Sequence, residues 1–85
     1  MYYDGLGIKH ELRDICIYGT VYYKDGLIAS NAIVVVEKIN DISSILIGYT
    51  VSDKHGKFLV RLKDRNSYYK ISVFEGKLNG EFYSK

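Results

Sequence analysis

Turn-forming residues recur at short intervals along this chain, and that spacing limits the fold more than any other feature. Combinations of Asp, Asn and Gly that favour turns stand at Lys24-Asp25-Gly26, Asn40-Asp41, Asp53 to Gly56, Asp64 to Asn66, and Asn79-Gly80. The apolar segments between them are about 6–9 residues long, a length typical of strands. No segment carries a helical stripe of useful length. The sequence therefore predicts an all-β fold.

Alternation of side chains identifies the first of these strands. The series Ile15, Ile17, Gly19 and Val21 alternates with the series Cys16, Tyr18, Thr20 and Tyr22, and period two is the signature of a strand with two different faces. Residues 32–36 read A-I-V-V-V, as expected for a central strand covered on both faces. Further strands are predicted at 45–51, 57–62 and 68–74, and an edge strand at 78–83.

These segments predict a small antiparallel, Ig-like β-sandwich of about seven strands. We expect residues 12–85 to form this single domain and residues 1–11, which contain Gly5 and Gly7, to be an extended N-terminal arm that docks elsewhere. The predicted core contains one alternating set of apolar residues from each strand: Ile17, Val21, Val34, Val36, Phe58, Val60, Ile71 and Val73.

Charge and cysteine content exclude several classes of protein. The net charge of the 85 residues is +2, with both signs interleaved, so nucleic acid is not an expected partner. A single cysteine, Cys16, excludes an intrachain disulfide and a cysteine-based zinc cage. The sequence shows neither a signal peptide nor an apolar run long enough to cross a membrane. We therefore expect a protein made in the cytoplasm, with no membrane partner and no export by a signal peptide.

The stretch V-S-D-K-H-G-K-F raises the question of a chemical site, because Asp53 and His55 lie two residues apart. Asp can cap a tight turn through its side chain, and Gly56 can adopt a positive φ without steric cost. A metal would need further ligands, and the cluster of His10, Glu11 and Asp14 has no recognisable spacing to this one. The turn is the favoured interpretation, and we expect no metal ion and no organic cofactor.

Motifs for catalysis are missing from the sequence. There is no G-x-S-x-G nucleophile motif and no glycine-rich phosphate loop after a strand. Nothing in the sequence near Cys16 would lower the pKa of its thiol, so it is interpreted as a small apolar filler or an outward-facing thiol. The sequence predicts a protein that is not an enzyme.

Tyrosine is unusually frequent, with nine residues. Tyr18 and Tyr22 share one strand face, opposite the apolar series, while Tyr2 and Tyr3 stand in the N-terminal arm. The rings either cover a thin core or form a contact surface, because Tyr is enriched where proteins meet. If the second interpretation holds, Tyr2, Tyr3, Tyr18 and Tyr22 are the partner-binding residues.

Three stretches together resemble a known family: I-C-I-Y-G-T-V-Y-Y-K-D-G-L-I-A-S-N-A-I-V-V-V, I-G-Y-T-V-S-D-K-H-G-K-F-L-V, and Y-Y-K-I-S-V. They resemble the carboxypeptidase regulatory-like domain, a transthyretin-like β-sandwich, over roughly residues 15–74. The resemblance implies structural roles for Gly19, Val21, Ala32, Val34, Val36, Thr50, Asp53, Gly56, Phe58, Tyr69, Ile71 and Val73. In place of the Pro-containing, Gly-ended bend of the family the chain has Ile28-Ala29-Ser30-Asn31, and we expect Asn31 to replace that Gly because Asn tolerates a left-handed φ.

The resemblance implies a non-catalytic module, since members of the family mostly stabilise or bind. Together with the surplus of Tyr, it leads us to expect an accessory structural protein (decoration, neck, tail or baseplate) of a phage or phage-tail-like particle. Its partners would be other protein subunits, in a homo- or hetero-oligomer. The alternative is a carbohydrate-binding module on which Tyr18 and Tyr22 stack against a glycan.

Overall fold

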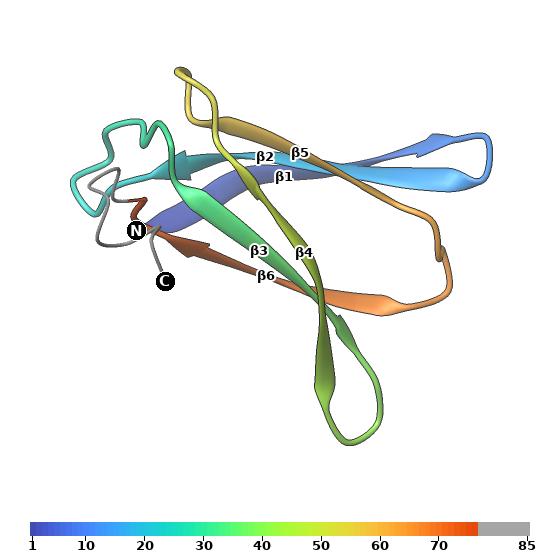
Figure 1. Cartoon of the computed structure of the whole chain (residues 1–85). Coiled ribbons are helices and arrows are strands. Elements are labelled where there is room, and N and C mark those ends of the chain that lie inside the picture. The colour runs from blue at the N-terminus through green and yellow to red at the C-terminus, as the bar shows by residue number, and fades with distance from the viewer. Residues whose placement is uncertain (77–85) are drawn as a thin grey trace.

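The computed structural model describes residues 1–76 and contains six strands in two antiparallel sheets, with no helix in that part of the chain (Figure 1). The first sheet has the order β1-β2-β5, and the second has the order β4-β3-β6. Their bounds are β1 Tyr2–Glu11, β2 Asp14–Tyr22, β3 Ile33–Ile39, β4 Ser44–Val51, β5 Lys57–Leu62 and β6 Tyr68–Phe74.

The all-β, antiparallel prediction is confirmed, but the strand count differs from it. The described residues form six strands rather than about seven. The edge strand predicted at 78–83 lies outside the described residues. The strands predicted at 45–51, 57–62 and 68–74 coincide with β4, β5 and β6 to within a residue at each end.

Residues 1–11, expected as an arm, contribute a strand to the first sheet. β1 pairs antiparallel with β2 from Tyr2 opposite Tyr22 to Glu11 opposite Asp14. The register shifts between Asp4 and Gly7, and Gly5 in this irregularity has a φ of 66°. A glycine that looks like a strand breaker in the sequence here permits a bulge, after which pairing resumes. The N-terminal segment is thus the edge strand next to β2.

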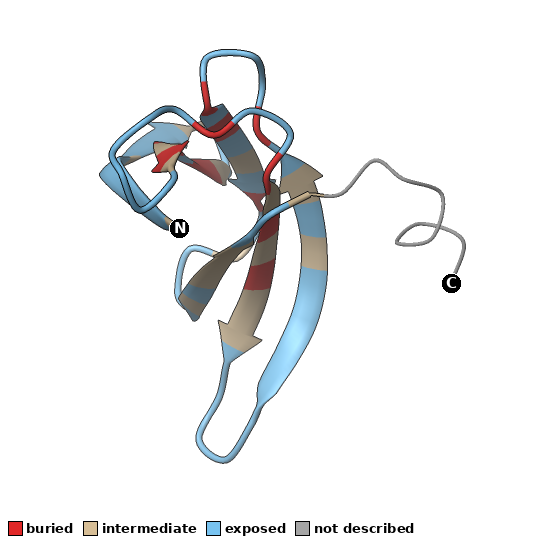
Figure 2. Cartoon of the chain, turned by 90° about the vertical axis from the view of Figure 1, so that its left-hand side faces the viewer, coloured by how far each residue is buried: buried red, intermediate tan, exposed pale blue. Residues whose placement is uncertain are grey.

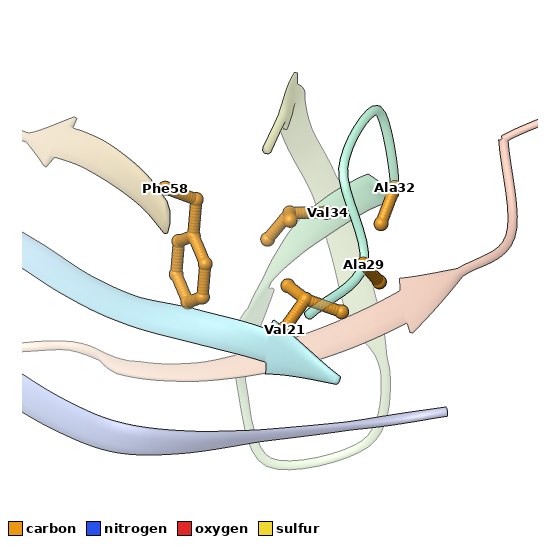
Figure 3. Packing of buried hydrophobic residues seen from close by; sticks show 5 residues of the cluster. All are labelled: Val21, Ala29, Ala32, Val34 and Phe58. Atoms are coloured by element: carbon orange, nitrogen blue, oxygen red, sulfur yellow. The ribbon is translucent and has the colours of Figure 1, made fainter. Parts of the chain in front are cut away.

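The core lies between the two sheets and is centred on their middle strands, β2 and β3. One cluster joins Val21 of β2, Val34 of β3 and Phe58 of β5 with Ala29 and Ala32 of the connection between β2 and β3 (Figure 3). Because β2 and β3 each have a hydrogen-bonded neighbour on both sides, their inward side chains are shielded best.

A second cluster continues the core toward the other end of β2, with Ile15, Ile17, Val36 and Leu62. All eight predicted core residues lie in or against these clusters. Five are buried, and Val60, Ile71 and Val73 are partly buried and pack against the buried members. Alternation in the sequence therefore identified the inward faces of β2, β3, β5 and β6 correctly.

The connection between β2 and β3 confirms the expectation for Asn31, whose φ is 58°. Its backbone N–H donates to the carbonyl oxygen of Ser52 at 3.0 Å, which ties this connection to the loop after β4. The backbone of Asn31 therefore adopts the left-handed conformation, which Asn tolerates better than most residues.

The hairpin of β3 and β4 extends beyond the first sheet, with its turn at residues 40–43 the most distant part (Figure 1). Its register shifts between Val36 and Glu37, which lie opposite Gly48 and Leu46. Ile47 is the extra residue on β4, so β4 carries a bulge. β4 pairs on one side with β3 and, among the described residues, has no hydrogen-bonded strand on its other side.

Candidate protein-contact surface

The Asp53 to Gly56 segment is a turn built from its own residues. Asp53 Oδ1 accepts hydrogen bonds from the backbone N–H of His55 at 2.8 Å and of Lys57 at 3.0 Å. These two donors hold the pKa of Asp53 below its ordinary value, with the bond from Lys57 the larger cause. Gly56 has a φ of 75°. The turn interpretation is confirmed, because the carboxylate already has partners in the loop itself.

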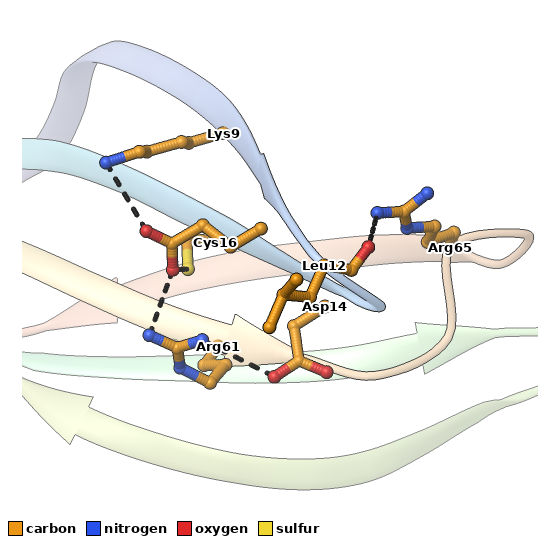
Figure 4. A network of polar contacts seen from close by, with 7 residues as sticks. Lys9, Leu12, Asp14, Cys16, Arg61 and Arg65 are labelled. Carbon is orange, nitrogen blue, oxygen red and sulfur yellow. Dashed lines mark hydrogen bonds and ion pairs between the residues drawn. The ribbon is translucent and has the colours of Figure 1, made fainter.

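The other acidic cluster, on the outer face of the first sheet, is a network of ion pairs (Figure 4). Arg61 of β5 contacts Glu11 at 3.0 Å and Asp14 at 3.4 Å, and these carboxylates raise the pKa of the guanidinium, with Asp14 the first cause. Lys9 contacts Glu11 at 3.3 Å. Since Arg61 links the edge strands β1 and β5 across β2, the network holds the outer face of this sheet together.

Cys16 lies under this network and is buried. Its Sγ donates to Glu11 Oε1 at 3.3 Å, and desolvation by burial, followed by this bond, raises the pKa of the thiol. The bond from Cys16 is in turn the largest cause that lowers the pKa of Glu11. A thiol with a raised pKa is a poor nucleophile. Among residues 1–76 no group of three or more His, Cys, Asp and Glu side chains is arranged to hold a metal ion.

Three of the four predicted contact tyrosines lie on the same outer face, and their rings pack on neighbours within the chain. Tyr2 and Tyr22 are opposite each other in the register, and their rings stack at a centroid distance of 5.3 Å. Tyr18 lies over Gly7 of β1, so closely that a Cβ at Gly7 would lie 2.3 Å from a ring atom of Tyr18. Tyr18 thus covers the backbone of Gly7 and Tyr2 stacks on Tyr22, although Tyr2 and Tyr18 stay exposed at 44% each.

Tyr3, the fourth, lies on the opposite face of the first sheet, because it is opposite Val21 of the core. With Leu6 and Ile8 of β1 it lines a groove whose other wall includes Tyr69 and Ile71 of β6. Neighbouring strand residues point to opposite faces, so Tyr2 and Tyr3 do not share one face. The structure therefore does not bring the four tyrosines together into one surface.

An exposed apolar surface lies instead on the second sheet. On β3, the side chains that alternate with the buried Val34 and Val36 point away from the core. These residues and their register neighbours on β4 and β6 define what we call the outer face of the second sheet. Its apolar members are Ile33, Val35, Ile39, Leu46, Tyr49, Val51, Tyr68 and Phe74. Exposure reaches 65% for Leu46, 71% for Tyr49 and 80% for Tyr68. Exposed apolar residues gathered on one face in this way mark interaction sites.

Few charges interrupt this face. Glu37 and Lys70 lie opposite each other in the register of β3 and β6, and Glu37 Oε2 accepts a hydrogen bond from Ser44 at 3.0 Å. The two opposite charges stand in the middle of the sheet, where each reduces the field of the other. Apart from Ser44 and Ser72, the rest of the face is aliphatic or aromatic, which suits contact with a protein better than contact with a polyanion.

The face ends at an edge strand without charges. Of the four edge strands in the described sheets, β1 contains Asp4, Lys9 and Glu11, β5 contains Lys57 and Arg61, and β6 contains Lys70. The eight residues of β4 read S-I-L-I-G-Y-T-V. Natural proteins commonly protect an exposed edge with Lys or Pro. β4 has neither, and Figure 2 shows the contrast between its mostly exposed length and the buried residues of β3.

Sequence reasoning identified β4 as a strand but missed its exposure. The usable signal was the run of eight uncharged, mainly apolar residues between two turns, which is equally compatible with a buried central strand. Pairing decides between the two, because β3 takes the central position and β4 the edge.

Comparisons of the chain with protein-family models, with curated proteins and with solved structures gave no match. Within residues 1–76 no helix is long and apolar enough to cross a membrane.

Proposed function

We propose that this protein is a non-catalytic module that binds other protein subunits in an assembly, and that the outer face of the second sheet is its contact surface. One observation carries the proposal: an apolar sheet face with Tyr49, Leu46 and Tyr68 exposed ends on the uncharged edge strand β4. Tyr and aliphatic side chains of this kind form the centre of protein interfaces.

The proposal keeps the setting that the sequence suggests, an accessory structural protein of a phage or phage-tail-like particle. It also keeps the transthyretin-like sandwich of the carboxypeptidase regulatory-like domain. Two three-stranded sheets with a shared core are compatible with such a sandwich. The contact residues differ from those first expected: Tyr2, Tyr18 and Tyr22 pack on neighbours in their own sheet, so they are weaker candidates than Tyr49 and Tyr68.

A second candidate function, glycan binding, is favoured by one specific observation. Beside Tyr18 lies a depression of about 450 Å³ that is also lined by Thr20, Asp53 and Lys57. An aromatic ring next to hydroxyl, carboxylate and ammonium groups is a combination that can bind a sugar. Against this candidate, the carboxylate of Asp53 already accepts two backbone hydrogen bonds.

Site-specific photocrosslinking in cells of the source organism separates the two functions. A benzophenone amino acid replaces Tyr68 on the outer face of the second sheet or, as the matched control, Tyr18 on the first sheet. The proposal expects crosslinks from position 68 to protein subunits that co-purify as one particle, and none from position 18.

Glycan binding is measured in parallel with the isolated protein on an array of oligosaccharides. If a glycan binds, if the variant Tyr18→Ala loses that binding, and if position 68 gives no protein crosslink, the assembly function is wrong and the carbohydrate-binding function replaces it.

A further inference from the structure

We propose that β4 pairs with β4 of a second copy of the chain, antiparallel and around a twofold axis, so that two second sheets become one continuous six-stranded sheet. This inference rests on the proposed function and names one of its partners. An unpaired strand edge presents a row of backbone N–H and C=O groups, and adding a strand satisfies them.

The register of β4 against itself supports a symmetric pair. With the axis between Ile47 and Gly48, Leu46 lies opposite Tyr49 of the second copy and Ser44 lies opposite its Val51. All four belong to the outer face of the second sheet, since their partners on β3 are Glu37, Val35, Ile39 and Ile33. In this register, outer-face residues of one copy therefore lie opposite outer-face residues of the other, despite the bulge at Ile47. The apolar outer face then continues across the junction, and exposed Leu46 and Tyr49 cover each other.

Charges at the two ends of β4 favour the antiparallel direction. Asp41 stands in the turn before the strand and Lys54 in the turn after it, and both are exposed. An antiparallel pair brings the Asp41 turn of each copy to the Lys54 turn of the other, whereas a parallel pair would bring Asp41 to Asp41 and Lys54 to Lys54. Asp53, the other acid of the second turn, is occupied by the N–H groups of His55 and Lys57. In the antiparallel pair, opposite charges therefore meet at each of the two ends of the paired β4 strands.

The shape of the fold leaves room for the second copy along the half of β4 nearest the β3–β4 turn. The hairpin of β3 and β4 extends past the first sheet (Figure 1), so the half of β4 nearest the turn is not blocked by β5. Pairing β4 with itself uses the open β4 edge of both copies at once, so growth through this contact stops at the dimer. Pairing β4 with a different edge would leave one β4 open and allow open-ended growth.

Sedimentation velocity and light scattering of the purified chain over a range of concentrations up to about 1 mM test the inference. The wild type should show a monomer–dimer equilibrium. The double variant Leu46→Lys with Tyr49→Lys places Lys opposite Lys across the axis, and it should raise the dissociation constant by about tenfold or more. The variant Leu46→Lys with Tyr49→Glu changes the same two positions but places Lys opposite Glu. It should dimerise at least ten times more tightly than the first variant.

A matched control adds the same charge outside that face: Leu12→Lys with Leu27→Lys, at exposed positions in the β1–β2 turn and the β2–β3 connection, should leave the dissociation constant within about twofold. Circular dichroism confirms that each variant is folded, as expected for exposed positions. A wild type that stays monomeric at every concentration overturns the inference, and so do two β4 variants that behave alike or a dimer that is lost in the control variant. If the chain is monomeric but position 68 still crosslinks to another protein, the dimer is wrong and the proposed function stands.

Discussion

The hydroxyl of Ser52 donates a hydrogen bond to the carbonyl oxygen of Ala29 at 2.7 Å, although the two residues are 23 positions apart. The hydroxyl oxygen of Ser52 in turn accepts a hydrogen bond from the backbone N–H of Ala32 at 2.9 Å. Ser52 is 2% exposed and is the buried polar side chain of the described core. It fastens the loop after β4 to the connection between β2 and β3, where Ala29 and Ala32 close the core.

We therefore expect Ser52→Ala to lower the free energy of unfolding by about 1–3 kcal/mol, because the change leaves a buried N–H and a buried carbonyl without their partner. Urea unfolding followed by circular dichroism measures this. The control Ser30→Ala, at an exposed position in the same connection, should change the value by less than about 0.5 kcal/mol. Equal effects of the two substitutions would show that the buried hydroxyl contributes nothing.

Phe58 is the largest side chain of the first core cluster and is 4% exposed. Phe58→Ala should cost about 3–5 kcal/mol, from lost burial and from the cavity left between the sheets, and in so small a domain it can abolish folding. Leu59→Ala, next along β5 but more than half exposed, is the matched control and should cost about 1 kcal/mol or less. Thermal unfolding of both variants decides, and a similar melting temperature for the two would mean that Phe58 is not in the core.

The sequence predicted the inward faces of β2, β3, β5 and β6 because no bulged residue interrupts the period of two along them, as in Ile15, Ile17 and Val21. It could not predict the outer face of the second sheet, because the bulge at Ile47 changes the parity of β4. By simple alternation Leu46 belongs with Gly48, but in the register it lies opposite Glu37 while Gly48 lies opposite Val36. Whether an apolar residue is core or surface thus depends on a non-local pairing that alternation does not contain.

The same reason explains why β1 looked like an arm. Gly5 and Gly7 interrupt the alternation in the sequence. In the structure this interruption is a single irregularity, and β1 pairs with β2 both before and after it. Local features were more predictable: the φ of Asn31 and the capping of the turn by Asp53 depend on residues close in sequence.

Asp64 makes folding stability depend on acid pH. Ser67, Lys38 at 2.9 Å and the N–H of Asn66 contact its carboxylate and hold its pKa well below the ordinary value of 3.8, with the bond from Ser67 the largest cause. A carboxylate with a lowered folded pKa stabilises the fold above its unfolded pKa, and this stabilisation is lost as the pH falls from 3.8 toward the folded value.

We expect the difference in unfolding free energy between the wild type and Asp64→Asn to be largest near neutral pH and to shrink as the pH falls below about 4. Chemical unfolding at a series of pH values measures this difference. Asp41→Asn, an exposed acid in the β3–β4 turn, serves as the control. A difference between wild type and Asp64→Asn that stays constant down to about pH 2 would contradict the prediction.

The thiol of Cys16 should report on how firmly β1 and β5 cover β2. The side chain is 1% exposed, lies opposite Lys9 on β1 and Arg61 on β5, and has a pKa raised chiefly by burial. Both burial and the low fraction of thiolate slow its reaction with an aromatic disulfide reagent. We expect native protein to react much more slowly than protein in denaturant.

Glu11→Ala removes the hydrogen-bond partner of Sγ and a contact of Arg61, so it should speed the native reaction while leaving the rate in denaturant unchanged. Lys57→Ala, also on β5 but opposite Thr20, should leave both rates unchanged. A native thiol that reacts as fast as the denatured one would mean that β1 does not stay paired over Cys16, and the edge strand would then open far more readily than its pairing with β2 implies.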